Sequence, residues 1–196
     1  MATKAREYDM TTRAAASGRT RDRLLRATRD RFADRRYDDV TLADVAAAAG
    51  VTVQTLLNHF GSKEGLLRVA AEFFAGEIAD LRGPVDPGDV DGAIEALLRH
   101  YEVLGDANWR LVADAERQPA LRELLVGARA EQRAWLEAVF GPRLPRRDVD
   151  REEAVTALYA TTDVGTWKLL RRDLGCTPEQ TRAVLRRLIA AQLEGG

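Results

Sequence analysis

The stretch VTLADVAAAAGVTVQTLLNHFGSKEGLL, residues 40–67, contains the signals of two short helices joined by a tight turn. Thr41 is placed to cap the first helix, and Asp44, three residues on, makes an acidic version of the capping box. Gly50 ends that helix with the left-handed conformation that a sharp turn commonly needs, and Thr52 is placed to cap the second. This pattern predicts a helix-turn-helix.

The second helix, expected from Val53 to about Phe60, presents two amide side chains on its outer face. If Leu56 and Phe60 point into a small core, the 100° step per residue places Gln54 and Asn58 on the opposite side. Two carboxamides one turn apart have the chemistry to pair bidentately with adenine in a DNA major groove. The alternative interpretation is that they are solvated polar residues of a small helix.

Other side chains of the same stretch favour the DNA interpretation. Val53, Thr55 and Leu57 flank the two carboxamides. His59, Lys63 and Thr41 stand at helix ends, where side-chain and backbone donors meet phosphates. The contacts with phosphate would hold the register, and those with bases would choose the sequence.

Composition and charge agree with a globular protein whose basic half docks on a polyanion. The chain has 196 residues, 45% hydrophobic and 31% charged, which is ordinary globular usage. Residues 1–70 hold 13 Lys or Arg against 9 Asp or Glu, whereas the rest of the chain is net acidic. No apolar run has the length of a membrane span, no signal peptide is evident, and Cys176 is the only cysteine. We therefore expect a cytoplasmic protein that does not bind a membrane.

Helical periodicity predicts an all-α fold of about nine helices in three parts. Residues 1–18 are expected to form a flexible basic arm, 19–66 the helix-turn-helix domain, and 67–196 a larger helical domain. A long helix from Ser62 to about Arg82 should connect the two domains. The later helices are expected over 89–104, 109–116, 119–140, 150–173 and 178–193.

The larger domain contains aromatic residues with two open interpretations. Tyr159, Asp163 and Trp167 fall at i, i+4 and i+8 of a predicted helix, so a carboxylate would lie between two rings. Such a face suits an apolar or cationic ligand, but it equally suits a core or a dimer interface. The remaining candidate ligand-binding residues are His100, Tyr101, Trp109 and Trp135, for which a structural role is the competing interpretation.

The sequence indicates no enzyme, metal or cofactor. No nucleophile–base set and no Gly-rich phosphate loop is evident, and the two histidines and one cysteine lack metal-ligand spacing. Glu152 and Glu153 begin a helix, where acids suit the positive end of the helix dipole without any catalytic role.

The 40–67 stretch resembles the DNA-binding motif of the TetR family of transcriptional regulators, over about residues 20–70. GTWKLLRRDLG followed by TPEQ, near the C-terminus, is also similar to the end of many such proteins. The resemblance implies that Thr41 is a phosphate-contacting cap and that residues 52–59 form the recognition helix. Val53, Gln54 and Thr55 would approach bases, and His59 and Lys63 would grip the backbone. Leu57 stands where the family usually has tyrosine, so its contact is a departure from the family.

The resemblance further implies a homodimeric, ligand-responsive regulator, and most often a repressor. A small-molecule effector, expected to be apolar or aromatic, would release it from a palindromic double-stranded operator. The dimer interface would come from about residues 150–173 and 178–193. Two alternatives remain: a DNA-binding protein without an effector, and an all-helical protein-interaction module.

Overall fold

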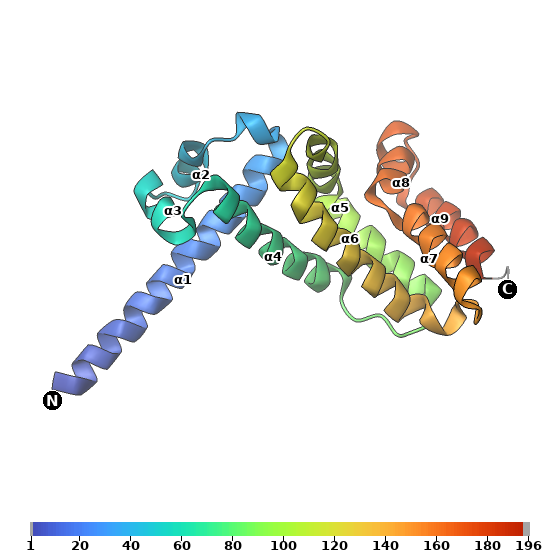
Figure 1. The fold of residues 1–196 in the computed structure, drawn as a ribbon, viewed down its shortest axis with the longest axis horizontal. Coiled ribbons are helices and arrows are strands. Elements are labelled where there is room, and N and C mark those ends of the chain that lie inside the picture. Colours follow the sequence, from blue (N-terminus) through green and yellow to red (C-terminus); the bar gives the residue numbers. More distant parts are fainter. Residues whose placement is uncertain (1, 194–196) are drawn as a thin grey trace. The chain divides into compact units, whose positions relative to one another are not determined.

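The computed structural model describes residues 2–193, with side chains from residue 15 onward, and all regular structure in this range is helical (Figure 1). The α-helices are α1 (Ala2–Asp34), α2 (Leu42–Ala48), α3 (Val53–Phe60), α4 (Lys63–Arg82), α5 (Val90–Ala115), α6 (Pro119–Phe140), α7 (Asp148–Thr162), α8 (Val164–Lys168) and α9 (Pro178–Leu193). Short 3₁₀ turns lie at Tyr37–Asp39 and Gly141–Arg143, and one π-helical turn lies at Leu169–Asp173. The all-α prediction is confirmed.

The chain divides into two compact units, with the division inside α4 between Phe74 and Ala75. In the first unit α1 packs against α2, and α2 against α3. The hydroxyl of the buried Thr28 donates to the Leu24 carbonyl at 2.8 Å, so this polar group enters the core already satisfied. The core residues of this unit are Leu24, Leu25, Ala27, Val40, Val45, Ala46, Ala49, Leu56, Phe60, Leu66 and Ala70.

The start of α1 includes residues 2–18, the segment that was expected to form a flexible basic arm. The backbone of residues 2–18 is helical and continues without a break into the core-forming part of α1. Alanine and arginine, which are frequent in this segment, are strong helix formers, and they extend a helix that is already nucleated further along. Helix propensity alone does not require an apolar stripe, so the segment can be helical without one. The mobility expected of the arm stays a prediction.

The second unit is built around α5. This helix packs against α6, α8 and α9, and α7 packs against both α6 and α9. The largest fully buried side chains of the unit are Trp167, Phe140, Ile94, Leu97, Leu121, Leu136, Leu158 and Ile189. These side chains come from five helices, and all of them except Leu121 belong to one continuous core.

Helix α5 is continuous, where two helices with a gap at about residues 105–108 were expected. Gly105 lies within it, and a Cβ built there would come 2.4 Å from a ring carbon of Trp167. The glycine is thus required for the close approach of the indole, and it does not mark the end of a helix. A glycine inside a helix lowers helix propensity by only about 1 kcal/mol, which packing readily offsets.

The helix expected from about 150 to 173 is broken at Asp163. This residue has φ −67° and ψ 153°, and its Oδ1 accepts a hydrogen bond from the Gly165 amide at 2.8 Å. Asp163 therefore ends α7 and caps α8, because a short acidic side chain competes for the backbone donors of a new helix start. The prediction that Tyr159, Asp163 and Trp167 share one helical face is wrong for this reason.

Candidate functional sites

Helix α2 begins with the predicted capping box. The Thr41 hydroxyl oxygen accepts from the Asp44 amide at 3.1 Å, and the Thr41 amide donates to Asp44 Oδ2 at 3.0 Å. Hydrogen bonds from the Thr41 side chain and backbone hold the pKa of Asp44 below its ordinary value. Thr41 is exposed, so its other atoms are open to solvent at this helix end.

The turn between α2 and α3 places the second helix at a defined angle. Gly50 has φ 67°, a conformation that favours glycine, and the Val51 amide closes the turn by donating to the Ala46 carbonyl at 2.9 Å. Thr52 then caps α3 by accepting from the Thr55 amide at 3.1 Å. Two capped helices joined by a hydrogen-bonded glycine turn form the predicted helix-turn-helix.

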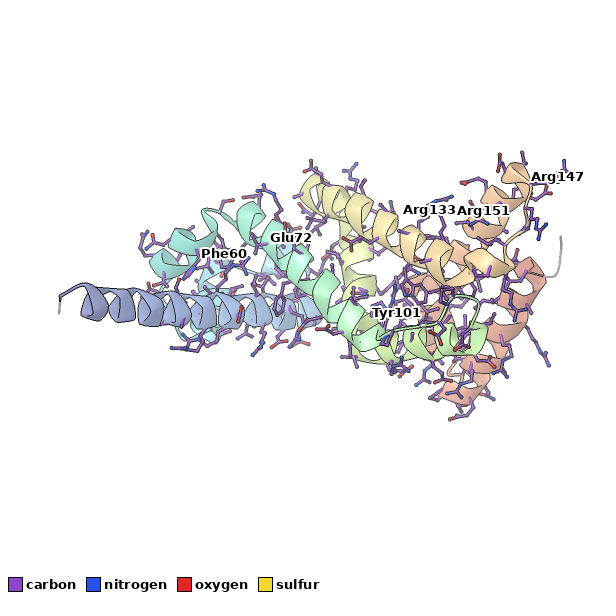
Figure 2. All side chains as sticks on the ribbon, turned by 90° about the horizontal axis from the view of Figure 1, so that it is seen from below. Phe60, Glu72, Tyr101, Arg133, Arg147 and Arg151 are labelled. Atoms are coloured by element: carbon purple, nitrogen blue, oxygen red, sulfur yellow. The ribbon has the colours of Figure 1, made fainter. Side chains whose placement is uncertain are left out.

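Helix α3 is held by its apolar side and exposes its amides. Leu56 is fully buried and Phe60, marked in Figure 2, is 8% exposed. Gln54 and Asn58 are exposed, and Gln54 Nε2 donates to Asn58 Oδ1 at 3.0 Å. The structure thus brings the two predicted base-reading side chains together on one face.

The flanking candidates differ in exposure. Val53 is 37% exposed, whereas Leu57 and His59 are half-buried. Thr55 is also half-buried, and its hydroxyl is 2.9 Å from that of Thr52. The side chains at the start of α3 are therefore the more accessible ones.

Lys63, predicted to grip phosphate, already has a partner in the protein. Its Nζ donates to the Tyr37 carbonyl at 2.8 Å and lies 4.1 Å from the centroid of the Tyr37 ring. Burial lowers the pKa of Lys63 and raises that of Tyr37. The lysine ties the short turn after α1 to the start of α4, and any phosphate contact would use its remaining N–H groups.

In the second unit, His100 and Tyr101 lie in a buried polar cluster. His100 is 2% exposed, and its Nε2 lies 3.0 Å from Asn108 Nδ2. Burial, and then the charge of Arg82, lower the pKa of His100 to about 3, so the ring is neutral at physiological pH. Tyr101, marked in Figure 2, donates its hydroxyl proton to the Thr162 carbonyl at 2.8 Å, and burial raises its pKa.

Arg82 and Gln132 complete this cluster, and the sequence-based prediction missed both. Arg82 Nη2 donates to Gln132 Oε1 at 2.6 Å and is 3.4 Å from His100 Nδ1, while its Cζ lies 4.4 Å from the centroid of the Trp135 ring. Gln132 Nε2 donates to the Thr162 hydroxyl at 3.3 Å. The available signal was a glutamine on the otherwise apolar side of α6, one turn before Trp135.

Of the other candidates, Trp167 is a core residue. It is 1% exposed, its indole N–H donates to Glu102 at 3.2 Å, and its ring centroid is 5.8 Å from that of Tyr101. Trp109 is only partly buried, with the Lys168 ammonium 5.2 Å from its ring centroid. The structural interpretation therefore applies to Trp167.

Tyr159 is half-buried, and burial followed by the Asp163 charge raises its pKa. The Asp163 carboxylate caps α8, as described above, which accounts for it without a ligand. Within the described range, no group of three or more His, Cys, Asp or Glu residues is arranged to hold a metal ion. None of the helices in that range combines the length and apolar character needed to cross a membrane.

The capped helices, the glycine turn and the exposed carboxamides define a helix-turn-helix protein. Residues 24–70 match the model of bacterial regulatory proteins of the tetR family. The HTH-type transcriptional regulator AlkX of Mycobacterium tuberculosis is 30% identical over 145 residues, which are 73% of this chain and 65% of that protein. The chain thus spans a little under two thirds of that relative, and its residues 24–70 form a helix-turn-helix domain of the tetR family of bacterial regulatory proteins.

Solved structures share the fold of both units. A transcriptional regulator from Rhodococcus sp. Rha1 is 20% identical with a TM-score of 0.69, covering 89% of this chain and 96% of its own. The TetR-like transcriptional regulator LfrR of Mycobacterium smegmatis, solved in complex with proflavine, is 22% identical with a TM-score of 0.56 and the same two coverages. At these identities the likeness shows the fold.

Proposed function

We propose that this chain is a DNA-binding transcriptional regulator, a homodimeric repressor that a small molecule releases from a palindromic operator. The observation that supports DNA binding best is the exposed Gln54–Asn58 pair on a capped helix that directly follows a glycine turn. The match of residues 24–70 to the tetR family agrees with it, and the relatives named above are transcriptional regulators.

On DNA, α3 would lie in the major groove with the two carboxamides toward base edges. Thr41 and Thr52 stand at the starts of α2 and α3, where backbone amides and the helix dipole favour a phosphate. In a two-fold dimer, the two recognition helices would meet successive major grooves about 34–36 Å apart. This spacing is the reason for expecting a palindromic operator.

Release would proceed through α4. This helix begins at Lys63, directly after the recognition helix, and ends at Arg82 in the buried polar cluster of the second unit. An effector that binds the cluster better in one conformation shifts the population toward it, and α4 is the element shared by both units. The proflavine complex of LfrR supports the idea of a small-molecule effector for this fold.

The dimer would use the exposed sides of α7 and α9, which pack against each other. These sides include the small or apolar residues Thr156, Ala160, Ala183 and Leu188, and Leu188 is 41% exposed. Leu188→Glu should convert the dimer to monomer in sedimentation at micromolar concentration, because two buried charges would meet at a two-fold interface. Val126→Glu on α6, where Val126 is 66% exposed, is the matched control and should leave the mass unchanged.

Selection of bound DNA from a random double-stranded pool tests the function directly. The expected result is an enriched sequence with two-fold symmetry, bound with an affinity that falls steeply as salt rises. A pool that shows no enrichment, together with salt-independent binding of a protein partner, would favour the interaction-module alternative. A compound screen on the selected complex then separates a ligand-responsive repressor from a DNA-binding protein without an effector.

A further inference from the structure

Arg82 is buried, and the groups that contact its guanidinium are uncharged. Its side chain is 6% exposed, and its Nε has no hydrogen-bond partner. The groups that contact it are the Gln132 carbonyl oxygen, the His100 ring nitrogen and the face of Trp135. No carboxylate of a described residue forms an ion pair with it, although the surface of the same unit has several Arg–carboxylate pairs.

A buried arginine in such surroundings is incompletely compensated. Guanidinium stays protonated in proteins, so the charge cannot be relieved by loss of a proton as it could for lysine. Removing a charge from water is costly unless an opposite charge and hydrogen bonds replace the solvent. An amide oxygen, a neutral imidazole and an indole face supply part of this compensation, and they leave the Nε donor without an acceptor.

We propose that Arg82 binds the carboxylate of an organic acid, and that this acid is the effector class of the protein. The inference rests on the proposed ligand-responsive function and specifies its ligand chemistry. A carboxylate supplies two planar oxygens that match the guanidinium fork and would provide an acceptor for Nε. One oxygen would replace Gln132 Oε1, and Gln132 would keep its bond to the Thr162 hydroxyl.

The residues around Arg82 also indicate the chemistry of the rest of the effector acid. Trp135 lies against the guanidinium, and the Tyr101 ring is tilted by 31° to that of His100 with ring centroids 4.3 Å apart. Tyr159 on α7 is half-buried and packs against the same core that contains Tyr101. These residues provide apolar and aromatic surface, so the acid should have an apolar body. An apolar or aromatic effector was expected from the sequence. The contacts of Arg82 narrow this class to apolar or aromatic compounds that also carry a carboxylate.

The test compares acids with amides of nearly the same shape. The probes are octanoate and octanamide, phenylacetate and phenylacetamide, and indole-3-acetate and indole-3-acetamide, each titrated into the full-length protein without DNA. Calorimetry gives the affinity, and a thermal melt provides a second readout. At least one acid should bind about tenfold or more tightly than its amide, because only the acid pairs with the buried cation.

Two variants test whether the preference for acids over amides depends on Arg82. Arg82→Gln should abolish the difference between acid and amide, and Arg82→Lys should reduce it, because a lysine ammonium lacks the planar fork. Arg133→Gln is the matched control: Arg133 is the neighbour of Gln132 on α6, but it pairs with Glu137 and Glu152 at the surface (Figure 2) and should keep the full preference. The comparison on the unaltered protein remains decisive even if an Arg82 variant does not fold.

Three results would overturn the proposal: no acid of the panel binds, amides bind as tightly as acids, or the preference for acids survives in Arg82→Gln. Failure of the proposed function would look different, because binding is measured without DNA. Acid binding that requires Arg82 but does not release the selected operator would retain this site and reject ligand-responsive repression. If only a neutral compound releases the operator, ligand-responsive repression is retained and the acid-binding site at Arg82 is rejected as the effector site.

Discussion

The side-chain amide of Gln54 donates a hydrogen bond to the side-chain oxygen of Asn58 across one turn of α3, with a nitrogen–oxygen distance of 3.0 Å. Each side chain thereby restricts the rotamers of the other before any partner binds. The Gln54 carbonyl oxygen and the Asn58 NH₂ group remain available to an adjacent base. The two carboxamides thus present one prearranged set of donors and acceptors.

Gln54→Ala should weaken binding to the selected operator by about 1–3 kcal/mol and relax the preference at one or two base positions. The loss combines a missing base contact with a less ordered Asn58. Selection from a randomised pool, compared with the unaltered protein, measures both effects. Glu72→Ala, an exposed change on α4 (Figure 2), should leave the preferred sequence as it was. An unaltered preference in the Gln54 variant would exclude base reading by this residue.

Lys63→Ala separates two roles of one ammonium group. Loss of its bond to the Tyr37 carbonyl and of its contact with the Tyr37 ring should lower the free energy of unfolding by roughly 1–2 kcal/mol. If Lys63 also contacts phosphate, the slope of log affinity against log salt should fall by about one. Urea unfolding and binding at several salt concentrations give the two numbers. Reduced stability with an unchanged salt slope would leave the lysine only its structural role.

Gly105→Ala should destabilise the protein by roughly 1–3 kcal/mol, because the added methyl group would meet the Trp167 ring at 2.4 Å. The gain in helix propensity, about 1 kcal/mol, is too small to offset this clash. Gly127→Ala on α6 is the matched control, since no atom lies within 4 Å of its added Cβ. Thermal melts should move in opposite directions for the two variants, and a stabilised Gly105 variant would show that the indole can shift freely.

His100 should make stability depend on pH between about 6.5 and 3. Its folded-state pKa, about 3, lies below the unfolded value of 6.5, so in this window the unfolded chain binds more protons. The free energy of unfolding therefore falls as pH falls, by up to about 1.4 kcal/mol per pH unit from this group. Carboxylates add a slope of the same sign, so urea unfolding of His100→Gln is needed for comparison. Parallel curves for the two proteins would mean that His100 titrates normally when folded.

Local signals were sufficient for the helix-turn-helix, because each depends on residues that are close in sequence. Thr41 caps through Asp44, Thr52 through the Thr55 amide, and Gly50 turns the chain by its own conformation. Gln54 and Asn58 share a face as a consequence of helical geometry alone. Prediction of this region therefore required no knowledge of how the helices pack.

The same local reasoning failed for helix boundaries that depend on tertiary packing or on the backbone conformation of one residue. A helix end was expected near residue 104, but α5 continues through Gly105, where Trp167, 62 positions later, occupies the space that a side chain would need. Asp163 was placed on a helical face with two aromatic residues, but as a cap it changes the direction of the chain and separates them. Periodicity cannot reveal either outcome, since both depend on contacts between distant segments or on a choice between two backbone conformations.

By itself, then, the sequence determined the helical class, the two capped helices and the face that α3 exposes, because these follow from bonds within one or two helical turns. The tertiary structure decided where charge is buried. Arg82 and Gln132 are 50 positions apart and carry no motif, yet contacts of the end of α4 with side chains of α5 and α6 enclose a guanidinium among neutral groups. An arginine at a helix end is ordinarily solvated. Arg82 is proposed as an acid-binding site because the surrounding helices exclude water from its guanidinium and leave the charge incompletely compensated.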